Sequence, residues 1–248
     1  MRISLAAVVG VAMLVSVGET QDFKARAIAI HRQTPLIDGH NDYPWALRGL
    51  DPGRDLNKAD ITKPVARLMT DVPRLRQGGV GAQFWSVYVP GEGTGFAATQ
   101  LEQIDIARRV IARYPDALRL TGTVAEVRAA RADGRLASLL GMEGGHAIQN
   151  SLGALRAHYD LGVRYMTLTH NTHTDWADSA AQRPARHHGL SAFGEQVVLE
   201  MNRLGMLVDL SHTSVETMDD ALRVSKAPVI FSHAAAKAVC PVPRNVPD

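Results

Sequence analysis

The chain has 248 residues, of which 46% are hydrophobic and 21% are charged, which is enough to bury the core of one α/β domain. Its formal net charge is +2, and no block of Lys and Arg interleaves with aromatic residues, so the composition argues against a nucleic-acid partner. The single cysteine, Cys240, excludes an intramolecular disulfide and a cysteine-based zinc site, which leaves histidine and carboxylate as metal ligands. We expect Cys240 itself to be a small buried residue.

Residues 1–20 have the pattern of a secretory signal peptide. Arg2 supplies a positive charge, an uncharged apolar stretch follows, and the small residues Ser16 and Gly18 suit a cleavage site. A short membrane anchor is the alternative, but a span needs about 20 apolar residues. We therefore expect export to a periplasm or secretion, no stable membrane span after removal of the signal, and a mature domain at residues 21–248.

Beyond the signal, helical and strand patterns alternate along the chain. Apolar runs predict strands at residues 34–40, 82–89, 137–143, 164–170, 206–212 and 227–233. Apolar spacing predicts helices at residues 23–33, 98–115, 124–134, 151–162, 190–205 and 214–225. Residues 43–80 form a longer excursion that includes an amphipathic segment. Repeated βα units imply a parallel sheet with right-handed crossovers, which is the pattern of a (β/α) barrel.

The predicted barrel is incomplete. A closed barrel of this type needs eight strands, whereas the sequence supplies six, and the last is followed only by a short tail without a helix. We interpret the fold as an α/β, TIM-like (β/α)8 barrel of the metal-dependent hydrolase type, truncated after strand six, with strands seven and eight missing. An open six-stranded sheet is the alternative.

Five of the six apolar runs deliver a residue that can bind a metal ion or ionise. These residues are His40 with Asp42, Glu143, His170, His212 and His233. In a parallel barrel the carboxyl ends of the strands open onto the active site, so we expect these side chains to meet at one rim. Imidazoles and carboxylates gathered in this way are typical of a metallohydrolase.

The same residues form a candidate two-metal site. His40 and Asp42 are two residues apart at a strand end, so both side chains reach the same side. Glu143 is an acid that is costly to bury unpaired, and His212 and His233 close consecutive units. Each has an ordinary alternative, namely a chance pair, a salt-bridged carboxylate or a core histidine. Together they suit two ions, with Glu143 bridging and a shared water that becomes hydroxide near neutral pH. Zinc fits these ligands, and manganese or cobalt is the alternative.

Two further residues are candidates for contacting the substrate. His170 is either another ligand or a donor that stabilises the oxyanion of a tetrahedral intermediate. Arg244 suits a substrate carboxylate, and its alternative is a surface charge on a loose tail. The other histidines considered, which we assign no ligand role, are His31, His146, His158, His187 and His188.

The motifs DGHND, GMEGGH, RYMTLTHNTHTDWADS, GMLVDLSH and PVIFSHAAAKAVCPVPRNVPD, in this order, resemble the membrane dipeptidase (renal dipeptidase) family of zinc metallopeptidases. The resemblance runs from about Thr34 to Asp248. It implies a TIM-like barrel with two Zn²⁺ that hydrolyses dipeptides and tolerates a D-residue at the C-terminal side. The family has a further aspartate on its last strand that assists proton transfer, and this chain ends before that position.

The resemblance also implies a role for each site residue. His40 and Asp42 would hold one zinc, His212 and His233 the other, Glu143 would bridge, His170 would contact the scissile region, and Arg244 would bind the dipeptide carboxylate. Mammalian members of the family are disulfide-linked and lipid-anchored. A lone cysteine and a bacterial-looking signal indicate a soluble periplasmic relative instead.

Two other functions stay open. A different binuclear amidohydrolase-type enzyme, such as a deaminase, lactonase or phosphotriesterase, usually presents His-x-His on strand one and often a lysine on strand four. Here His40-x-Asp42 and His170 occupy those places, which favours the dipeptidase. A non-catalytic metal-binding remnant is the third reading, because the C-terminal strands are missing. The expected partner is a small dipeptide, and a homodimer is one assembly open to the chain.

Overall fold

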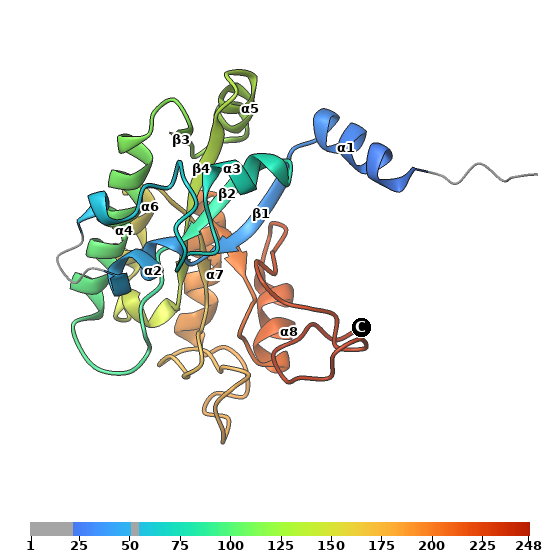
Figure 1. Cartoon of the computed structure of the whole chain (residues 1–248). Helices are drawn as coiled ribbons and strands as arrows, with labels where there is room; N and C mark the ends of the chain where they lie inside the picture. Colours follow the sequence, from blue (N-terminus) through green and yellow to red (C-terminus); the bar gives the residue numbers. More distant parts are fainter. Residues whose placement is uncertain (1–21, 51–54) are drawn as a thin grey trace, which may run out of the picture.

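The computed structural model describes residues 22–50 and 55–248, so the predicted signal peptide at residues 1–20 lies outside the described residues. The described residues form one parallel sheet with helices around it (Figure 1). Its strands are β1 (Leu36–Asn41), β2 (Val80–Ser86), β3 (Leu118–Leu120), β4 (Leu136–Glu143), β5 (Val163–Thr167) and β6 (Leu207–Asp209). The order is β1-β2-β4-β5-β6, and β3 pairs with β4. The sheet is a half-barrel, which confirms the predicted TIM-like α/β fold.

Strand β4 is the centre of this sheet. Ala137 and Ser138 pair with both β2 and β3, so β3 lies on the edge of β4 that faces away from β2. The C-terminal half of the same edge, from Leu140 to Glu143, pairs with β5. Every residue of β4 is buried, which explains why its sequence reads as a continuous apolar run.

Six of the helices agree with the sequence pattern, and the described part of the excursion at residues 43–80 contains two more. They are α1 (Phe23–Gln33), α2 (Tyr43–Leu50), α3 (Val72–Gln77), α4 (Phe96–Arg113), α5 (Val124–Ala132), α6 (Leu152–Asp160), α7 (Ala192–Leu204) and α8 (Val215–Val224), with short 3₁₀ turns η1 (Leu56–Lys58) and η2 (Gly145–Ile148). Side chains of Ser151, Ser191 and Ser214 cap three of them by accepting a backbone N–H, and Thr123 with Glu126 forms a capping box. None of these helices is both long and apolar enough to cross a membrane.

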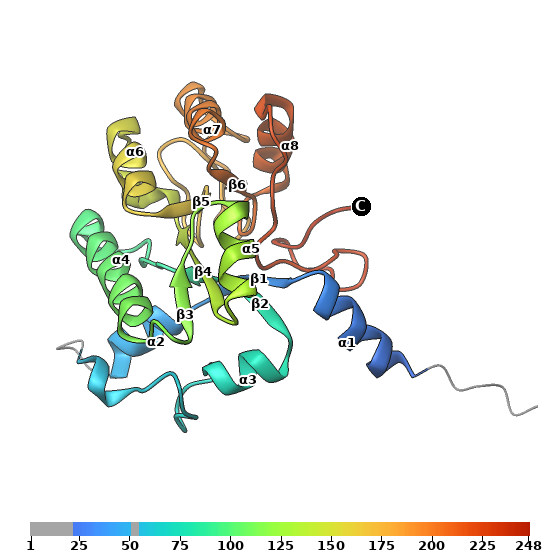
Figure 2. The ribbon, with the colours of Figure 1, turned by 90° about the horizontal axis from the view of Figure 1, so that it is seen from above.

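Two apolar cores lie on the two faces of the sheet. The larger one packs α4, α6, α7 and α8 against the outer face, whereas α5 packs inside the curve (Figure 2). Side chains alternate along β4, so that Leu140 and Met142 join the outer core while Ala137 and Leu139 join the inner one. This alternation points Glu143, the last residue of β4, to the inner face at the carboxyl end.

Two details of the predicted strands are wrong. The run at residues 227–233 forms only an isolated bridge, between Ile230 and Asp209, instead of a sixth strand. Pro228 has no N–H to donate, and the N–H of Ser232 goes to the Asp209 carboxylate instead of to a ladder. Strand β3 was not expected, since three residues are too few to show a period. The described residues therefore contain six strands, of which five match the predicted runs.

Cys240 is also placed differently from the expectation. The thiol residue is exposed, because residues 236–243 run along the surface as turns. Short backbone hydrogen bonds within this segment, such as that from the Cys240 N–H to the Ala236 carbonyl, replace packing into a core. Cys240 is therefore not the small buried residue that its apolar neighbours indicated.

Candidate metal centre

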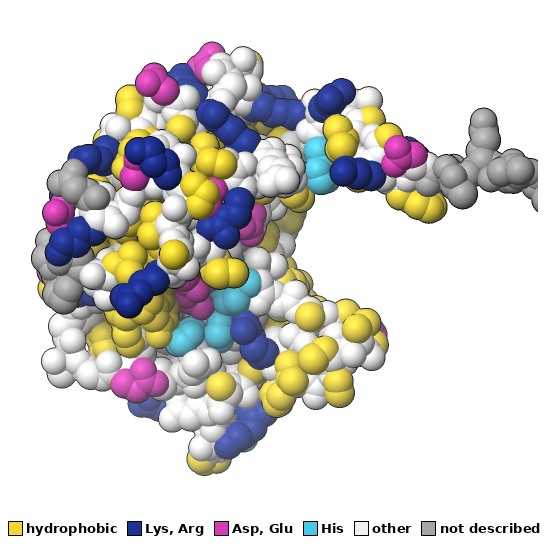
Figure 3. Space-filling model, viewed as in Figure 1, with side chains coloured by type: hydrophobic (Ala, Val, Ile, Leu, Met, Phe, Trp, Pro, Cys, Tyr) yellow, Lys and Arg dark blue, Asp and Glu magenta, His cyan; other side chains and the backbone are white. Residues whose placement is uncertain are grey.

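The structure brings all seven expected site residues to one cavity. It has a volume of about 330 Å³ and is lined by His40, Asp42, Trp45, Tyr88, Glu143, His170, His212, His233 and Arg244. Histidine side chains gather where the surface of the molecule is hollowed, with acidic and basic side chains next to them (Figure 3). A larger cavity of about 890 Å³ lies on the inner face near the opposite ends of the strands. Its lining is mostly apolar and without a histidine–carboxylate cluster, so the smaller cavity is the candidate site.

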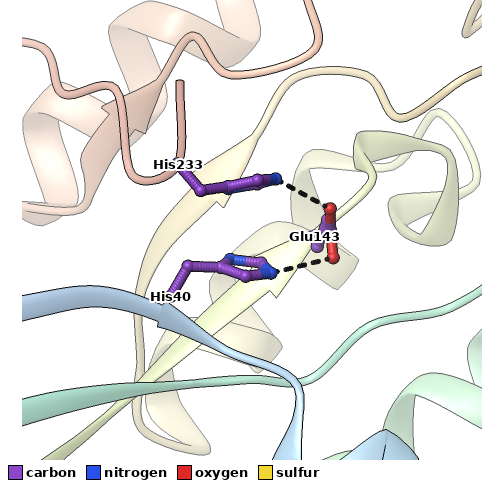
Figure 4. A group of neighbouring side chains, drawn as sticks. All are labelled: His40, Glu143 and His233. Atoms are coloured by element: carbon purple, nitrogen blue, oxygen red, sulfur yellow. Dashed lines mark ion pairs between the residues drawn. The ribbon is translucent and has the colours of Figure 1, made fainter. Parts of the chain in front are cut away.

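Glu143 is the hub of the cluster. It is only 4% exposed, and its Oε2 lies 3.3 Å from Nε2 of His40. Its Oε1 lies 3.2 Å from Nε2 of both His212 and His233, and Figure 4 shows His40 and His233 on its two oxygens. Nε2 of His170 is 3.7 Å from Oε1. Because the two oxygens face different histidines, Glu143 has the geometry of a bridging carboxylate.

Two sets of ligand atoms meet at this carboxylate. His40, Glu143 and His233 form one set, and Glu143, His170 and His212 form the other, with the ligand atoms of each set within 4.8 Å of one another. The Nε2 atoms of His212 and His233, which belong to different sets, also lie 2.8 Å apart. Asp42 stands at the rim, half-exposed, with Oδ1 3.3 Å from Nε2 of His40.

The far nitrogens of three histidines have oxygen partners. Nδ1 of His40 lies 2.8 Å from the Tyr165 hydroxyl, and Nδ1 of His212 lies 3.2 Å from Oδ1 of Asn171. Nδ1 of His233 lies 2.8 Å from Oγ of Ser232. A ligating histidine usually donates its second N–H in this way, which leaves Nε2 free for the metal. The donor set of imidazole and carboxylate therefore fits zinc.

The ionisable groups of the cavity have shifted pKa values. Burial lowers the pKa of His40, but Asp42 and Glu143 outweigh it and raise the pKa to about 9. Burial alone would raise the pKa of Glu143, yet the neighbouring imidazoles of His212, His233 and His40 hold it well below its usual range. Burial lowers the pKa of His170 to about 4. The pKa of the Arg244 guanidinium is also lowered by burial, against the attraction of Glu143.

Local backbone geometry brings the site residues together. His212 has a φ of 66°, a strained conformation for a residue with a side chain, and its carbonyl accepts the Ala180 N–H at 2.8 Å. At Gly39 a Cβ would lie 2.6 Å from the Ser232 carbonyl oxygen. Glycine is therefore required for β1 to approach the segment that carries His233.

Arg244 is part of the cavity wall and not a charge on a loose tail. Its Nη2 donates to the His233 carbonyl at 2.8 Å, and its Nε is buried without a partner among the described residues. Trp45 and Tyr88 complete the wall, with ring centroids 5.0 Å apart, and Tyr88 also meets His170 edge-on. We did not single out these aromatics from the sequence, although Tyr88 follows β2 at the same rim as the other site residues.

The histidines without a predicted ligand role lie elsewhere. His158 is a buried core residue of α6, and His146 lies in η2 against the ring of Phe96. His187 and His188 belong to the loop between β5 and α7, in which the buried Asp178 accepts backbone N–H groups. None of these side chains lines the cavity.

A parallel half-barrel with histidines and carboxylates at its carboxyl edge has the architecture of the barrel class of metal-dependent hydrolases. Comparison with known proteins makes this assignment specific. The sequence model of the membrane dipeptidase family, peptidase family M19, matches residues 24–248, and the chain belongs to this family.

Individual relatives agree with the family assignment. The chain is 46% identical to Dipeptidase 3 of Mus musculus, over 91% of this chain and 46% of that protein. It is 45% identical to Dipeptidase verJ of Clonostachys rogersoniana, over 92% of this chain and 61% of that protein. The chain thus spans about half the length of the curated relatives it matches.

A solved structure is similar in fold as well. It is a metallo peptidase of Rhodobacter sphaeroides liganded with a phosphinate mimic of the dipeptide L-Ala-D-Ala. The TM-score is 0.72 and the identity 27%, with 86% of this chain and 68% of that chain covered.

Proposed function

We propose that this chain carries the metal centre of a zinc-dependent dipeptidase that hydrolyses the single peptide bond of a dipeptide. The observation that carries the proposal is the convergence of four imidazoles on the two oxygens of Glu143, in a chain of the membrane dipeptidase family. Two Zn²⁺ held here, with Glu143 bridging, would supply a nucleophilic water near neutral pH and polarise the scissile carbonyl. No serine or cysteine nucleophile is then needed.

The proposed ligands follow the motif assignments. His40 and Asp42 hold one ion, and His212 and His233 hold the other. The short contacts of His40 with Asp42 and of His212 with His233 support this pairing. His170 stays free for the substrate, consistent with its longer distance from Glu143.

Substrate binding is assigned to His170 and Arg244. Burial keeps the His170 imidazole neutral at neutral pH, so it can donate an N–H to the carbonyl oxygen as negative charge develops there. The Arg244 guanidinium faces the same cavity and suits the free carboxylate of a dipeptide. A cavity of about 330 Å³ favours a small substrate over a long peptide.

A C-terminal D-residue is part of the proposal. The relative from Rhodobacter sphaeroides is liganded with a mimic of L-Ala-D-Ala, which supports a site of this type that accepts the D configuration. Export to a periplasm, supported by the signal-like residues 1–20, and a homodimer are proposals as well.

The test is hydrolysis of L-Ala-D-Ala and L-Ala-L-Ala by the zinc-loaded chain, with release of alanine as the readout. We expect turnover of both dipeptides. We expect the C-terminal amide of each dipeptide to be a poor substrate. Arg244→Ala should raise KM by about 10-fold to 100-fold, because a charge-assisted hydrogen bond is lost, while Arg244→Lys should lose less.

A zinc-loaded, folded chain that leaves both dipeptides intact would contradict the proposal. Hydrolysis of a lactone or a phosphotriester by the same zinc-loaded chain would then favour another binuclear metallohydrolase. Zinc binding without any turnover would favour the non-catalytic metal-binding chain.

A further inference from the structure

The carboxylate of Asp209 is buried, lies outside the cavity and has no role in the proposed reaction. It is the last residue of β6 and is fully buried. Its Oδ1 accepts the backbone N–H of Ser211 at 3.1 Å and that of Ser232 at 2.9 Å. These two serines directly precede His212 and His233. Asp209 therefore ties together the two segments that carry these histidines.

The other oxygen of Asp209 accepts two hydroxyl groups. The hydroxyls of Thr167 and Ser232 each lie 2.6 Å from Oδ2. Since a carboxylate has no hydrogen to give, Ser232 must donate its only hydroxyl hydrogen to Asp209. Oγ of Ser232 lies 2.8 Å from Nδ1 of His233, so in this second contact it can only accept.

The direction of these hydrogen bonds determines the proton position on the His233 ring. Nδ1 must carry the hydrogen that Ser232 accepts, so Nε2 of the neutral ring keeps its lone pair. That lone pair faces Glu143 and the Nε2 of His212, at 3.2 and 2.8 Å. Without the carboxylate, Ser232 is free to donate to Nδ1, and the ring hydrogen then moves to Nε2 and blocks the ligand position.

We propose that Asp209 is a positioning residue for the metal centre: acting through the Ser232 hydroxyl, it holds His233 in the form that has its hydrogen on Nδ1 and a free Nε2. The inference rests on the proposed metal site. It assigns no contact with the substrate to Asp209 or Ser232. Carboxylates that orient a ligating histidine typically change metal affinity by about 10-fold to 100-fold when they are replaced.

Thr167 provides a matched control. Its hydroxyl makes the same 2.6 Å hydrogen bond to Oδ2 of Asp209 and is fully buried, but none of its hydrogen bonds reaches a histidine. Thr167→Val therefore removes one buried hydrogen bond to Asp209 and leaves the path to His233 intact. Ser232→Thr keeps the hydroxyl and serves as the conservative variant.

The experiment measures zinc affinity by competition with a chelator, on the full chain with each substitution. We expect Ser232→Ala and Asp209→Asn to bind the more weakly held of the two zinc ions about 10-fold to 100-fold less tightly than wild type does. For Thr167→Val and Ser232→Thr we expect a zinc affinity within about threefold of the wild-type value. Equal losses in Ser232→Ala and Thr167→Val would reduce Asp209 to a structural role and overturn the inference. A wild-type chain that binds no zinc would instead overturn the proposed metal site.

A second readout does not depend on how well the variants fold. The ¹⁵N chemical shifts of the histidine rings report which nitrogen carries the hydrogen, and the His233→Gln spectrum assigns the signals. In the zinc-free wild-type chain at a pH where His233 is neutral, we expect the hydrogen on Nδ1. A hydrogen on Nε2 would contradict the inference whatever the variants do.

Discussion

At the scale of single residues, the histidines of this chain differ because their surroundings differ. Two carboxylates raise the pKa of His40, whereas burial lowers the pKa of His170 and of His158. His158 is 4% exposed in α6, and its Nδ1 has no hydrogen-bond partner in the described part of the chain. Its ring is therefore expected to be buried in the neutral form.

This burial predicts a dependence of stability on pH. The folded-state pKa of His158 lies below the unfolded value of 6.5, so the unfolded chain takes up the proton first as the pH falls. Above about pH 6.5 His158 does not lower the free energy of unfolding. Below that pH this one group lowers the free energy of unfolding by no more than about 1.4 kcal/mol per pH unit.

Urea unfolding at pH 7 and pH 5.5 measures the effect. Wild type should lose more free energy of unfolding than His158→Leu over this interval, because the leucine has no proton to bind. Other groups titrate equally in both proteins, so the difference isolates His158. The same loss in both would show that His158 accepts its proton in the folded state.

At the scale of elements, adjacent strands hold the histidines through close packing. A Cβ at Gly141 of β4 would lie 2.0 Å from Cζ of Tyr165 on β5 and 2.5 Å from its hydroxyl oxygen. That hydroxyl contacts Nδ1 of His40 on β1 at 2.8 Å. A glycine in β4 thus makes room for a tyrosine of β5 that contacts His40 on β1.

Gly141→Ala should therefore affect both stability and metal binding. The buried ring has to move, which costs about 1–3 kcal/mol as overpacking, and His40 loses its oriented partner. The free energy of unfolding and the zinc affinity should fall together. Gly49→Ala in α2 is the control, since nothing lies within 4 Å of its added Cβ. Unchanged zinc affinity in a destabilised Gly141→Ala would separate Tyr165 from the metal centre.

The sequence predicts some elements better than others for physical reasons. Strand β4 is recognised as a long continuous apolar run, and helix α5 by its capping residues and helical spacing. Strand β3 has only three residues, which is too short for a recognisable pattern. The run at 227–233 does not form a regular strand, because Pro228 has no N–H and the N–H of Ser232 bonds to the Asp209 carboxylate. In residues 227–233 the backbone bonds to a side chain instead of to a neighbouring strand, and the spacing of apolar residues cannot show this.

At the scale of the whole molecule, the half-barrel explains why residues far apart in sequence meet. Parallel strands end at the same edge, so the strand-end positions of His40, Glu143 and His212 were enough to predict one rim. The orienting partners Tyr165, Asn171 and Ser232 were not predicted. They act from neighbouring strands and loops, and nothing in their own sequence context distinguishes them from packing residues.

The two-zinc centre bridged by Glu143 is the central claim, and metal content tests it most directly. Elemental analysis of the folded, monodisperse chain should give about two zinc per chain, and Glu143→Ala should lose them, because both ions depend on this carboxylate. Circular dichroism of the variant confirms that it is folded. A folded wild-type chain without bound metal after zinc loading would contradict the account.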